Sequence, residues 1–363
     1  MRLSARTVAL ATVLLTPFVL GSGNEAAPAD DVLSSWLVTP DASTPMQAIA
    51  DKFEIEHRHG QAFEVIVPAR RQAEFLQLAP LATLKMADIR DEFRMLDQAD
   101  PGHFADYHSF EAVMAKLADI ATQHPDFAKL VQYGTSTGGR PLMALKLSDN
   151  VAEDEDEPEL MLTAATHGDE LITTEVLLGL IDELVAGYGT DARLAAMIDD
   201  HELFMIPVVN ADGFASRSRY SDGLDPNRDY PWPETPNRTS VRPIDAIIRF
   251  FNERNIVGSI DLHAYGQLVM FPWAYTATPP SNDDVQTFSA LGNEMAAVNG
   301  YEVGQISRII YVAKGSSADY YYWKKGTVAY GIEMTTSKAP PSSRIPGVVT
   351  EGREMLWKFI EHF

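Results

Sequence analysis

The chain has 363 residues, 45% of them hydrophobic, and its 51 acidic residues outnumber 29 basic ones to give a formal net charge of −22 at pH 7. This length supports one large domain or a large and a small one, and the negative charge disfavours nucleic acid and anionic lipid as partners, because both would repel it. The chain has 0 cysteines, which excludes disulfides and thiol catalysis.

Residues 1–29 have the composition of a signal peptide. Arg2 and Arg6 form a basic start, residues 8–20 are apolar, and Ala27-Pro28-Ala29 has the small-x-small pattern that precedes a cleavage point. An uncleaved anchor is the alternative, but this apolar stretch is too short to cross a bilayer. We therefore expect an exported protein, periplasmic or extracellular, without a membrane partner. We also expect it to act as a monomer.

Residues 30–95 have the pattern of a small α+β unit. We expect strands and helices in the order strand 36–38, helix 44–53, strand 62–68, helix 69–78 and strand 84–89. Residues 96–106 (LDQADPGHFAD) are polar and contain proline and glycine, so we expect them to form a linker.

From residue 107 to residue 363, strands alternate with helices. The segment 159–165 (ELMLTAA) is an apolar strand of the kind that is buried on both faces of a sheet. This alternation predicts an α/β domain in which a sheet carries helices on both faces. The expected elements are helix 110–124, strands 128–134, 141–148 and 159–165, helix 171–187, strand 203–209, helix 244–252, strand 257–262, helix 283–299, strand 328–334 and helix 350–362.

Five consecutive acidic residues, from Glu153 to Glu157, lie between two of these strands. Such a run could bind a cation, although most runs of like charge are solvated. We expect a solvated loop.

Two His-x-x-Glu tetrads occur, His108–Glu111 and His167–Glu170, and chance alone can produce one. His108 opens an amphipathic helix, where a surface position is the commoner outcome. His167 follows the strand 159–165, and loops at the carboxyl ends of sheet strands are where α/β folds place their chemistry. His263, at the end of strand 257–262, has the setting of a third ligand. Taken alone, a histidine at a strand end is more often structural, so its assignment depends on the motifs that accompany it. Two imidazoles and one carboxylate suit one catalytic Zn²⁺, which keeps a fourth position open for water.

Six segments carry further motifs: His167-Gly168-Asp169-Glu170, Asn210-Ala211-Asp212-Gly213, Asp225-Pro226-Asn227-Arg228, His263, Tyr311-Val312-Ala313-Lys314-Gly315-Ser316 and Gly331-Ile332-Glu333. Their order resembles that of the zinc metallocarboxypeptidases of the carboxypeptidase A/B family, over residues 105–363. The resemblance implies a mixed, mostly eight-stranded twisted sheet with helices on both faces. It also implies one zinc ion, and hydrolysis of the C-terminal bond of peptides and proteins.

The small unit, residues 30–95, resembles the pro-domain of this family in pattern alone. We expect it to cover the active-site cleft until a cut within residues 90–106, where Arg90 and Arg94 are basic. A folding aid that is never removed is the alternative.

The resemblance implies catalytic roles for two residues. Glu333 is expected to take the proton of the zinc-bound water and pass it to the leaving amine. A carboxylate on a buried strand is costly unless it is paired, which favours a function for this residue. Arg219 is the expected oxyanion-stabilising residue, with Arg217 as a close competitor.

The resemblance also implies the residues that bind the substrate. Arg228 is expected to grip the terminal carboxylate, because a guanidinium meets a carboxylate in a two-pronged geometry. Asn227 and Tyr311 are expected to add hydrogen bonds to the same carboxylate, and Tyr265 is a further substrate contact.

The sequence departs from the family pattern at Ala211 and Asp229, neither of which is expected to be a direct ligand. Small apolar residues, Ala318 and Ala274, are expected on opposite walls of the pocket for the C-terminal side chain, which favours apolar or aromatic residues. Lys314 would favour acidic residues instead if it points into that pocket.

Three other functions remain open. A peptidoglycan peptide amidase could use the same metal site, and only substrate assays would separate it. A non-catalytic binding member of the fold should have lost a ligand or Glu333, and this chain keeps all of them. A small-amide deacylase would not need the carboxylate-binding set.

Overall fold

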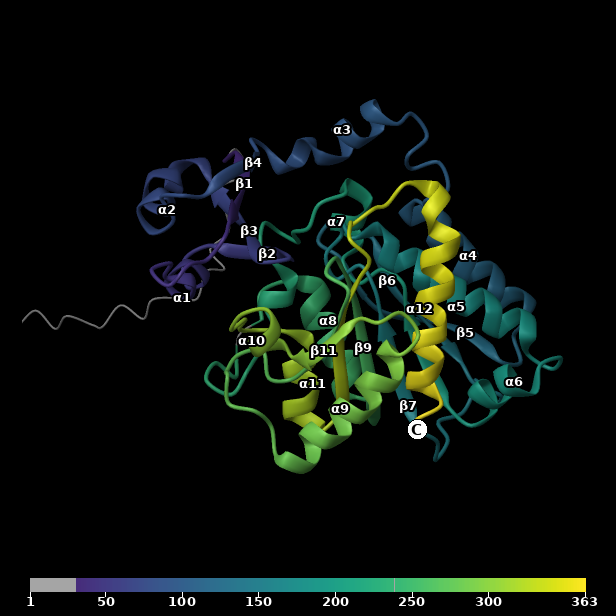
Figure 1. Ribbon diagram of the computed structural model, residues 1–363. Coiled ribbons are helices and arrows are strands. Elements are labelled where there is room, and N and C mark those ends of the chain that lie inside the picture. The colour runs from purple at the N-terminus through teal and green to yellow at the C-terminus, as the bar shows by residue number, and fades with distance from the viewer. Residues whose placement is uncertain (1–30, 238) are drawn as a thin grey trace, which may run out of the picture.

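The computed structural model describes residues 31–237 and 239–363, which form two sheets (Figure 1). The predicted signal peptide, residues 1–29, lies outside the described residues. Of the helices in the described part of the chain, none has the length and apolar character needed to cross a membrane.

The N-terminal unit, residues 31–99, is built on a four-stranded sheet in the order β2-β3-β1-β4, with antiparallel pairing throughout. It has an apolar core of its own, in which Trp36, Val65 and Phe75 are buried together. Its elements are β1 (Leu33–Val38), α1 (Met46–Ala50), β2 (Glu54–His59), β3 (Ala62–Pro68), α2 (Gln72–Leu78), β4 (Thr83–Met86) and α3 (Glu92–Ala99).

Three expectations for this unit were wrong in detail. The helix expected over 44–53 is shorter in the structure, where α1 covers only Met46–Ala50. The strand β2 follows it, where no strand was expected. β4 ends at Met86 rather than at residue 89. The expected linker 96–106 begins inside α3, whose Phe93 is buried against Phe104 with ring centroids 5.5 Å apart. This apolar contact stabilises a helix in a segment whose composition indicated a loop.

The larger sheet has eight strands in the order β11-β10-β12-β9-β7-β8-β6-β5. The four central strands, from β12 to β8, are mutually parallel, and antiparallel partners flank them on both sides. The strands are β5 (Ala128–Thr135), β6 (Pro141–Leu147), β7 (Glu159–Thr163), β8 (Glu202–Ile206), β9 (Ile256–Ala264), β10 (Leu268–Phe271), β11 (Glu302–Gln305) and β12 (Val328–Met334).

Helices cover both faces of this sheet, which confirms the predicted fold class (Figure 1). The parallel strands are apolar on both faces because each face meets a helix layer. One layer contains α4 (Phe110–Gln123), α5 (Leu171–Gly187), α9 (Asn282–Ala296) and α12 (Ile345–Ile360), and the other contains α8 (Arg242–Asn252) and α11 (Ser317–Lys325). Short helices complete the fold: α6 (Ala192–Asp199), α7 (Ala211–Ser216) and α10 (Ile306–Ile309).

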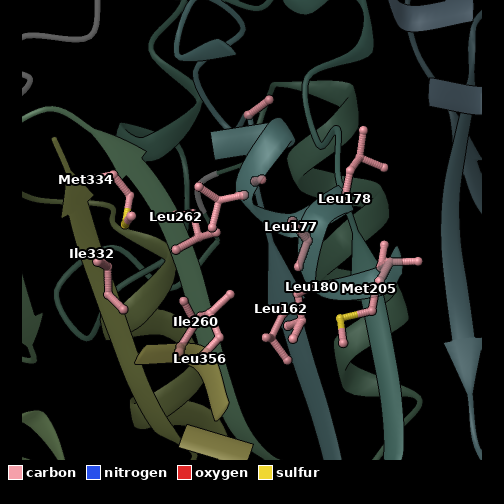
Figure 2. Close-up of a cluster of buried hydrophobic side chains, with 14 of the residues drawn as sticks. Leu162, Leu177, Leu178, Leu180, Met205, Ile260, Leu262, Ile332, Met334 and Leu356 are labelled. Atoms are coloured by element: carbon pink, nitrogen blue, oxygen red, sulfur yellow. The ribbon is translucent and has the colours of Figure 1, made fainter. Parts of the chain in front are cut away.

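Alternate residues of one strand enter different cores. Leu160 and Leu162 of β7 pack in the cluster that contains α5 and α12, whereas Met161 packs with the residues of α8. Figure 2 shows the first of these clusters, in which side chains from four strands face two helices: Leu162, Leu177, Leu178, Leu180, Met205, Ile260, Leu262, Ile332, Met334 and Leu356.

The strand order places a crevice at the carboxyl ends of the central strands. After β7 the chain forms β8 on one side of it, and then crosses to form β9 on the other side. Loops that leave such a reversal point diverge and open a crevice where α/β folds bind their ligands. The predicted site residues lie at this edge.

Candidate active site

The three predicted metal ligands come together at the carboxyl edge of the larger sheet. His167 and Glu170 lie in the loop after β7, and His263 lies near the end of β9. His167 Nδ1 is 2.7 Å from Glu170 Oε1, and His263 Nδ1 is 3.1 Å from Glu170 Oε2 and 3.2 Å from His167 Nδ1. All three side chains are buried. Two imidazole nitrogens and a carboxylate that converge in this way form the donor set of a zinc site.

A further observation shows that these residues fit zinc. His167 Nε2 lies 3.0 Å from Asp225 Oδ1, and His263 Nε2 lies 3.1 Å from Asp261 Oδ2. Zinc-binding histidines usually direct the ring nitrogen away from the metal to a carboxylate, which fixes the tautomer and the ring orientation. Both outer nitrogens therefore have partners, and both Nδ1 atoms remain to face a metal ion.

The Asn210-Ala211-Asp212-Gly213 motif orders the loop that follows β8. Asn210 Oδ1 accepts the Gly213 N–H at 3.0 Å, and Asn210 Nδ2 donates to the carbonyl oxygens of Arg219 and Tyr220. A Cβ atom added to Gly168 of the metal loop would lie 2.1 Å from the carbonyl carbon of Gly213. The metal loop and this loop therefore pack directly on each other and hold Arg219 beside the metal ligands.

Glu333 lies at the end of β12, level with His263 on the neighbouring parallel strand β9. Its Oε2 is buried and, among the described residues, has no hydrogen-bond partner. Burial raises the pKa of Glu333 to about 7, and the negative charge of Glu170 adds to the rise. A buried carboxyl oxygen without a donor is costly, which is typical of a functional group whose partner is the substrate or a water molecule.

Arg219 lies at the metal ligands, and Arg217 does not. Arg219 Nη1 is 3.0 Å from His167 Nδ1 and 3.3 Å from Glu170 Oε1, and Nη2 donates to Asp225 Oδ2 at 2.9 Å. The guanidinium of Arg217 instead lies over the ring of Phe104, 4.3 Å from its centroid. Of the two arginines, Arg219 is therefore the one that lies beside the predicted metal ligands.

The predicted carboxylate-binding residues lie together on the same cleft. Arg228 donates to the hydroxyl of Tyr311 and, at 2.8 Å, to the carbonyl oxygen of Asn227. In the part of the chain that the structure describes, Arg228 forms no salt bridge, although its side chain is partly buried. Asn227 Oδ1 accepts the N–H of Ser317 at 2.9 Å, which ties this segment to the start of α11.

An apolar wall continues the cleft beyond Arg228. Ala274 and Ala318 both line the cleft here, and both are buried. A Cβ atom added to Gly331 would meet no atom within 4 Å, so there is open space beside β12. Lys314 lines a separate hollow between β2 and the tyrosine segment, not this wall. The other apolar residues of the wall are Leu268, Met270, Ile306 and Ala313.

Strand β2 of the N-terminal unit lies in the cleft. Glu54 forms a salt bridge with Arg219 and accepts the hydroxyl of Tyr220 at 2.8 Å. The carbonyl oxygen of Ile55 accepts the Tyr311 hydroxyl at 2.6 Å.

The next residues of β2 also contact the larger region. The ring of His57 stacks on that of Tyr265, with centroids 4.1 Å apart, and accepts the Tyr265 N–H through Nδ1 at 3.3 Å. Arg58 donates to the carbonyl oxygen of Ile309 at 2.7 Å. The predicted substrate residues Tyr311 and Tyr265 are therefore both in contact with β2.

Lys338, which follows β12, joins three parts of the chain. Its buried Nζ bonds to Glu56 of β2, lies 2.8 Å from Asp169 of the metal loop and 3.5 Å from Glu92 of α3. These contacts were not predicted, because Lys338 belongs to no recognised motif. The alternation of polar and less polar residues in Glu54–His59 is a weak strand signal that could have indicated β2.

The other His-x-x-Glu tetrad takes no part in the site. His108 donates its backbone N–H to Glu175 Oε1 at 2.8 Å, and its Nδ1 lies 2.8 Å from Glu175 Oε2. His108 therefore joins the start of α4 to α5, and it is partly buried rather than on the surface.

Comparisons with known proteins agree with this geometry. The sequence profile of the family described as "Zinc carboxypeptidase" matches residues 113–355. A zinc carboxypeptidase of Saccharothrix mutabilis subsp. capreolus is 28% identical over 399 aligned positions, which cover 94% of this chain and 90% of that protein. Carboxypeptidase A2 of Rattus norvegicus is 28% identical over 271 positions, which cover 64% of each protein.

Solved structures share the fold. The carboxypeptidase A of Helicoverpa armigera superposes with a TM-score of 0.76 at 20% identity, over 91% of this chain and 97% of that one. Thrombin activatable fibrinolysis inhibitor gives a TM-score of 0.69 at 18% identity, over 92% and 98%. Since the family profile matches well over half of the sequence, and His167, Glu170 and His263 form a zinc donor set, this chain belongs to the zinc carboxypeptidase family of peptide-bond hydrolases.

Proposed function

We propose that this chain is a metallocarboxypeptidase that removes single residues from the free C-terminus of peptides. The observation that carries the proposal is the position of Arg228: a partly buried guanidinium without a salt bridge in the described structure, in the same cleft as the zinc ligands. A free carboxylate is the group that satisfies such a guanidinium best, through two parallel hydrogen bonds.

His167, Glu170 and His263 would hold zinc, which supplies Lewis-acid polarisation of the scissile carbonyl and lowers the pKa of a bound water molecule. Glu333, whose buried Oε2 has no hydrogen-bond partner in the described structure, would accept a proton from the attacking water and deliver it to the leaving amine. Its raised pKa, about 7, suits a group that must both accept and donate a proton near neutral pH. Arg219 stabilises the negative charge that develops on the carbonyl oxygen.

Substrate binding uses the other half of the cleft. Arg228, Asn227 and Tyr311 hold the terminal carboxylate, and the wall that contains Ala274 and Ala318 receives the last side chain. Because that wall is apolar and Lys314 lies outside it, apolar and aromatic C-terminal residues are the proposed substrates.

We further infer that the N-terminal unit is a pro-segment that keeps the uncut chain inactive. β2 contacts Arg219, Tyr311 and Tyr265, so a peptide could not reach them while β2 is in place. The structural likeness to the Helicoverpa armigera protein covers 91% of the chain, which is more than residues 107–363 alone could supply. The basic and apolar start of the sequence favours export to the periplasm or the extracellular space, and we propose that the enzyme acts there as a monomer.

The test is a peptide panel with free and amidated C-termini, assayed with Arg228→Ala. Hydrogen bonds to charged groups contribute about 1.5–3 kcal/mol, and a charge left unpaired costs more. The variant should therefore raise KM for free-carboxylate peptides by about one to three orders of magnitude. Arg217→Ala is the matched control and should leave KM unchanged, because Arg217 lies over Phe104 outside the cleft.

Amidated peptides should be poor substrates and insensitive to the variant. Efficient cleavage of amidated peptides, or internal cleavage of a long peptide, would overturn the proposal. Faster hydrolysis of cell-wall peptides than of ordinary peptides would favour the peptidoglycan amidase instead.

A further inference from the structure

The acidic run Glu153–Glu157 is more than a solvated loop. It lies between β6 and β7, and one carboxylate oxygen in each of Glu155, Glu157 and Glu159 is buried without a partner in the described part of the chain. Burying a carboxylate oxygen without a hydrogen bond is costly. Glu155 and Glu157 are grouped with Asp149, whereas the oxygen of Glu159 belongs to a second group of carboxylates.

Glu159 and Glu202 are the centre of this arrangement. They are the first residues of the parallel strands β7 and β8 and lie directly opposite each other in the register. Glu159 is 6% exposed and Glu202 is 2% exposed. Two adjacent carboxylates at this depth repel each other, and this position lies at the opposite end of the strands from the zinc ligands.

Asp154 of the acidic run completes a group of three. One carboxylate oxygen from each of Asp154, Glu159 and Glu202 lies within 4.8 Å of the others, and the three line one surface hollow. Glu159 Oε1 accepts the Asn255 N–H at 3.1 Å, while Oε2 is the buried oxygen without a partner. Burial raises the pKa of Glu159, and the charges of Glu202 and Asp154 add to the rise against the hydrogen bond from Asn255.

The basic residues nearby neutralise only part of this charge. Lys146 Nζ donates to Glu202 Oε1 at 2.7 Å and to the carbonyl oxygen of Glu153 at 2.5 Å. Arg254 packs over the ring of Phe250, 3.6 Å from its centroid, and donates to the Phe250 carbonyl oxygen. Neither side chain supplies a hydrogen bond to Glu159 Oε2.

We propose that Asp154, Glu159 and Glu202 bind a calcium ion between the amino ends of β7 and β8. The donors are all carboxylate oxygens, with no imidazole, which suits a hard cation and disfavours zinc or copper. Calcium accepts irregular oxygen sets and tolerates water in the remaining positions, whereas magnesium demands near-ideal octahedral geometry. The ion would fix the acidic loop to the strand that leads to His167.

The test uses the full chain, loaded with zinc and dialysed into calcium-free buffer. Calorimetric titration with CaCl₂ should show one site, and the melting temperature should rise with calcium concentration, because a ligand that binds only the folded state stabilises it. MgCl₂ should give a clearly smaller rise.

Three variants make the test specific. Glu159→Gln should abolish the calcium-dependent rise, and Asp154→Asn should weaken calcium binding by about tenfold or more. Asp154 is exposed, so its substitution should not disturb folding even if that of Glu159 does. Asp156→Asn is the matched control: it removes one exposed charge from the same run without touching the site and should keep the full rise.

Absence of calcium binding by the unmutated chain would overturn the proposed site. An equal calcium-dependent rise in melting temperature in all three variants would overturn it as well. An equal response to magnesium would overturn the assignment to calcium. Hydrolysis of peptides at constant temperature should not change with calcium, so this result is independent of the proposed carboxypeptidase activity.

Discussion

The N-terminal unit and the larger region both consist of a sheet packed with helices, but they are stabilised differently where they meet. Inside each region, apolar clusters dominate. Between the two regions, the ion pairs Glu54 with Arg219 and Glu56 with Lys338 add to hydrogen bonds, ring stacking and the apolar contact of Phe93. A buried ion pair gives little net stability but is costly to leave half-made. These two ion pairs therefore make the interface specific for its partner more than they add to its stability.

Removal of one metal ligand should have the largest effect, because it should inactivate the larger region and leave the N-terminal unit folded. We expect His263→Ala to lose zinc and all measurable peptide hydrolysis, while the N-terminal unit stays folded on its own apolar cluster. Metal analysis, circular dichroism and a peptide assay after limited proteolysis would measure this. His108→Ala, in the other tetrad, should keep one zinc ion per chain. Tight binding of one equivalent of zinc by His263→Ala would show that the ligand assignment is wrong.

Glu333→Gln tests the chemistry of the larger region without changing its metal. The variant should retain zinc, because the amide replaces a group that is not a ligand. Its kcat should fall by at least about 10²- to 10⁴-fold, since one residue would serve as both base and acid. Near-normal turnover, with zinc present, would place the base elsewhere.

Limited proteolysis should release the N-terminal unit from the larger region and thereby change the activity. A cut after Arg90 or Arg94 would sever α3 or its start, and peptide hydrolysis should then rise severalfold as β2 leaves the cleft. The time course of cleavage on a gel should match the time course of activity. Equal activity before and after complete cleavage would remove the pro-segment proposal.

A further effect is expected from one ion pair at the interface. Glu56→Gln should weaken docking of the N-terminal unit by about 1.5–3 kcal/mol, the range for a hydrogen bond to a charged group. The uncut variant should show higher basal hydrolysis and faster cleavage near Arg94. Glu74→Gln is the control, because Glu74 pairs with Lys52 on the surface of the same unit and should change neither rate. If both variants behave alike, the ion pair with Lys338 does not hold the unit.

The central strands could be predicted from local signals in the sequence, and the zinc ligands from such signals together with the family resemblance. Helix 171–187 and strand 328–334 have the expected bounds, and His167 and His263 stand at the ends of apolar strands. β2 could not be predicted in the same way. Glu54 and Glu56 are polar residues whose burial depends on Arg219 and Lys338, which are far away in the sequence.

The burial of carboxylates next to the acidic run Glu153–Glu157 could not be predicted from the sequence either. The composition of this run indicated solvation, and Glu153, Asp154 and Asp156 are indeed exposed. The burial of Glu159 and Glu202 follows only from their place at the start of two paired strands, which a run of like charges in the sequence does not reveal.

Arg219 touches the metal ligands His167 and Glu170 on one side and Glu54 of β2 on the other. Two binding events that share one side chain are thermodynamically linked, and the linkage is reciprocal. Whatever zinc does to the affinity of the cleft for β2, docking of β2 must do to the affinity for zinc by the same factor. For the proposed pro-segment, docking of β2 and binding of zinc would therefore be two linked equilibria, so that zinc affinity and activity change together when β2 leaves the cleft.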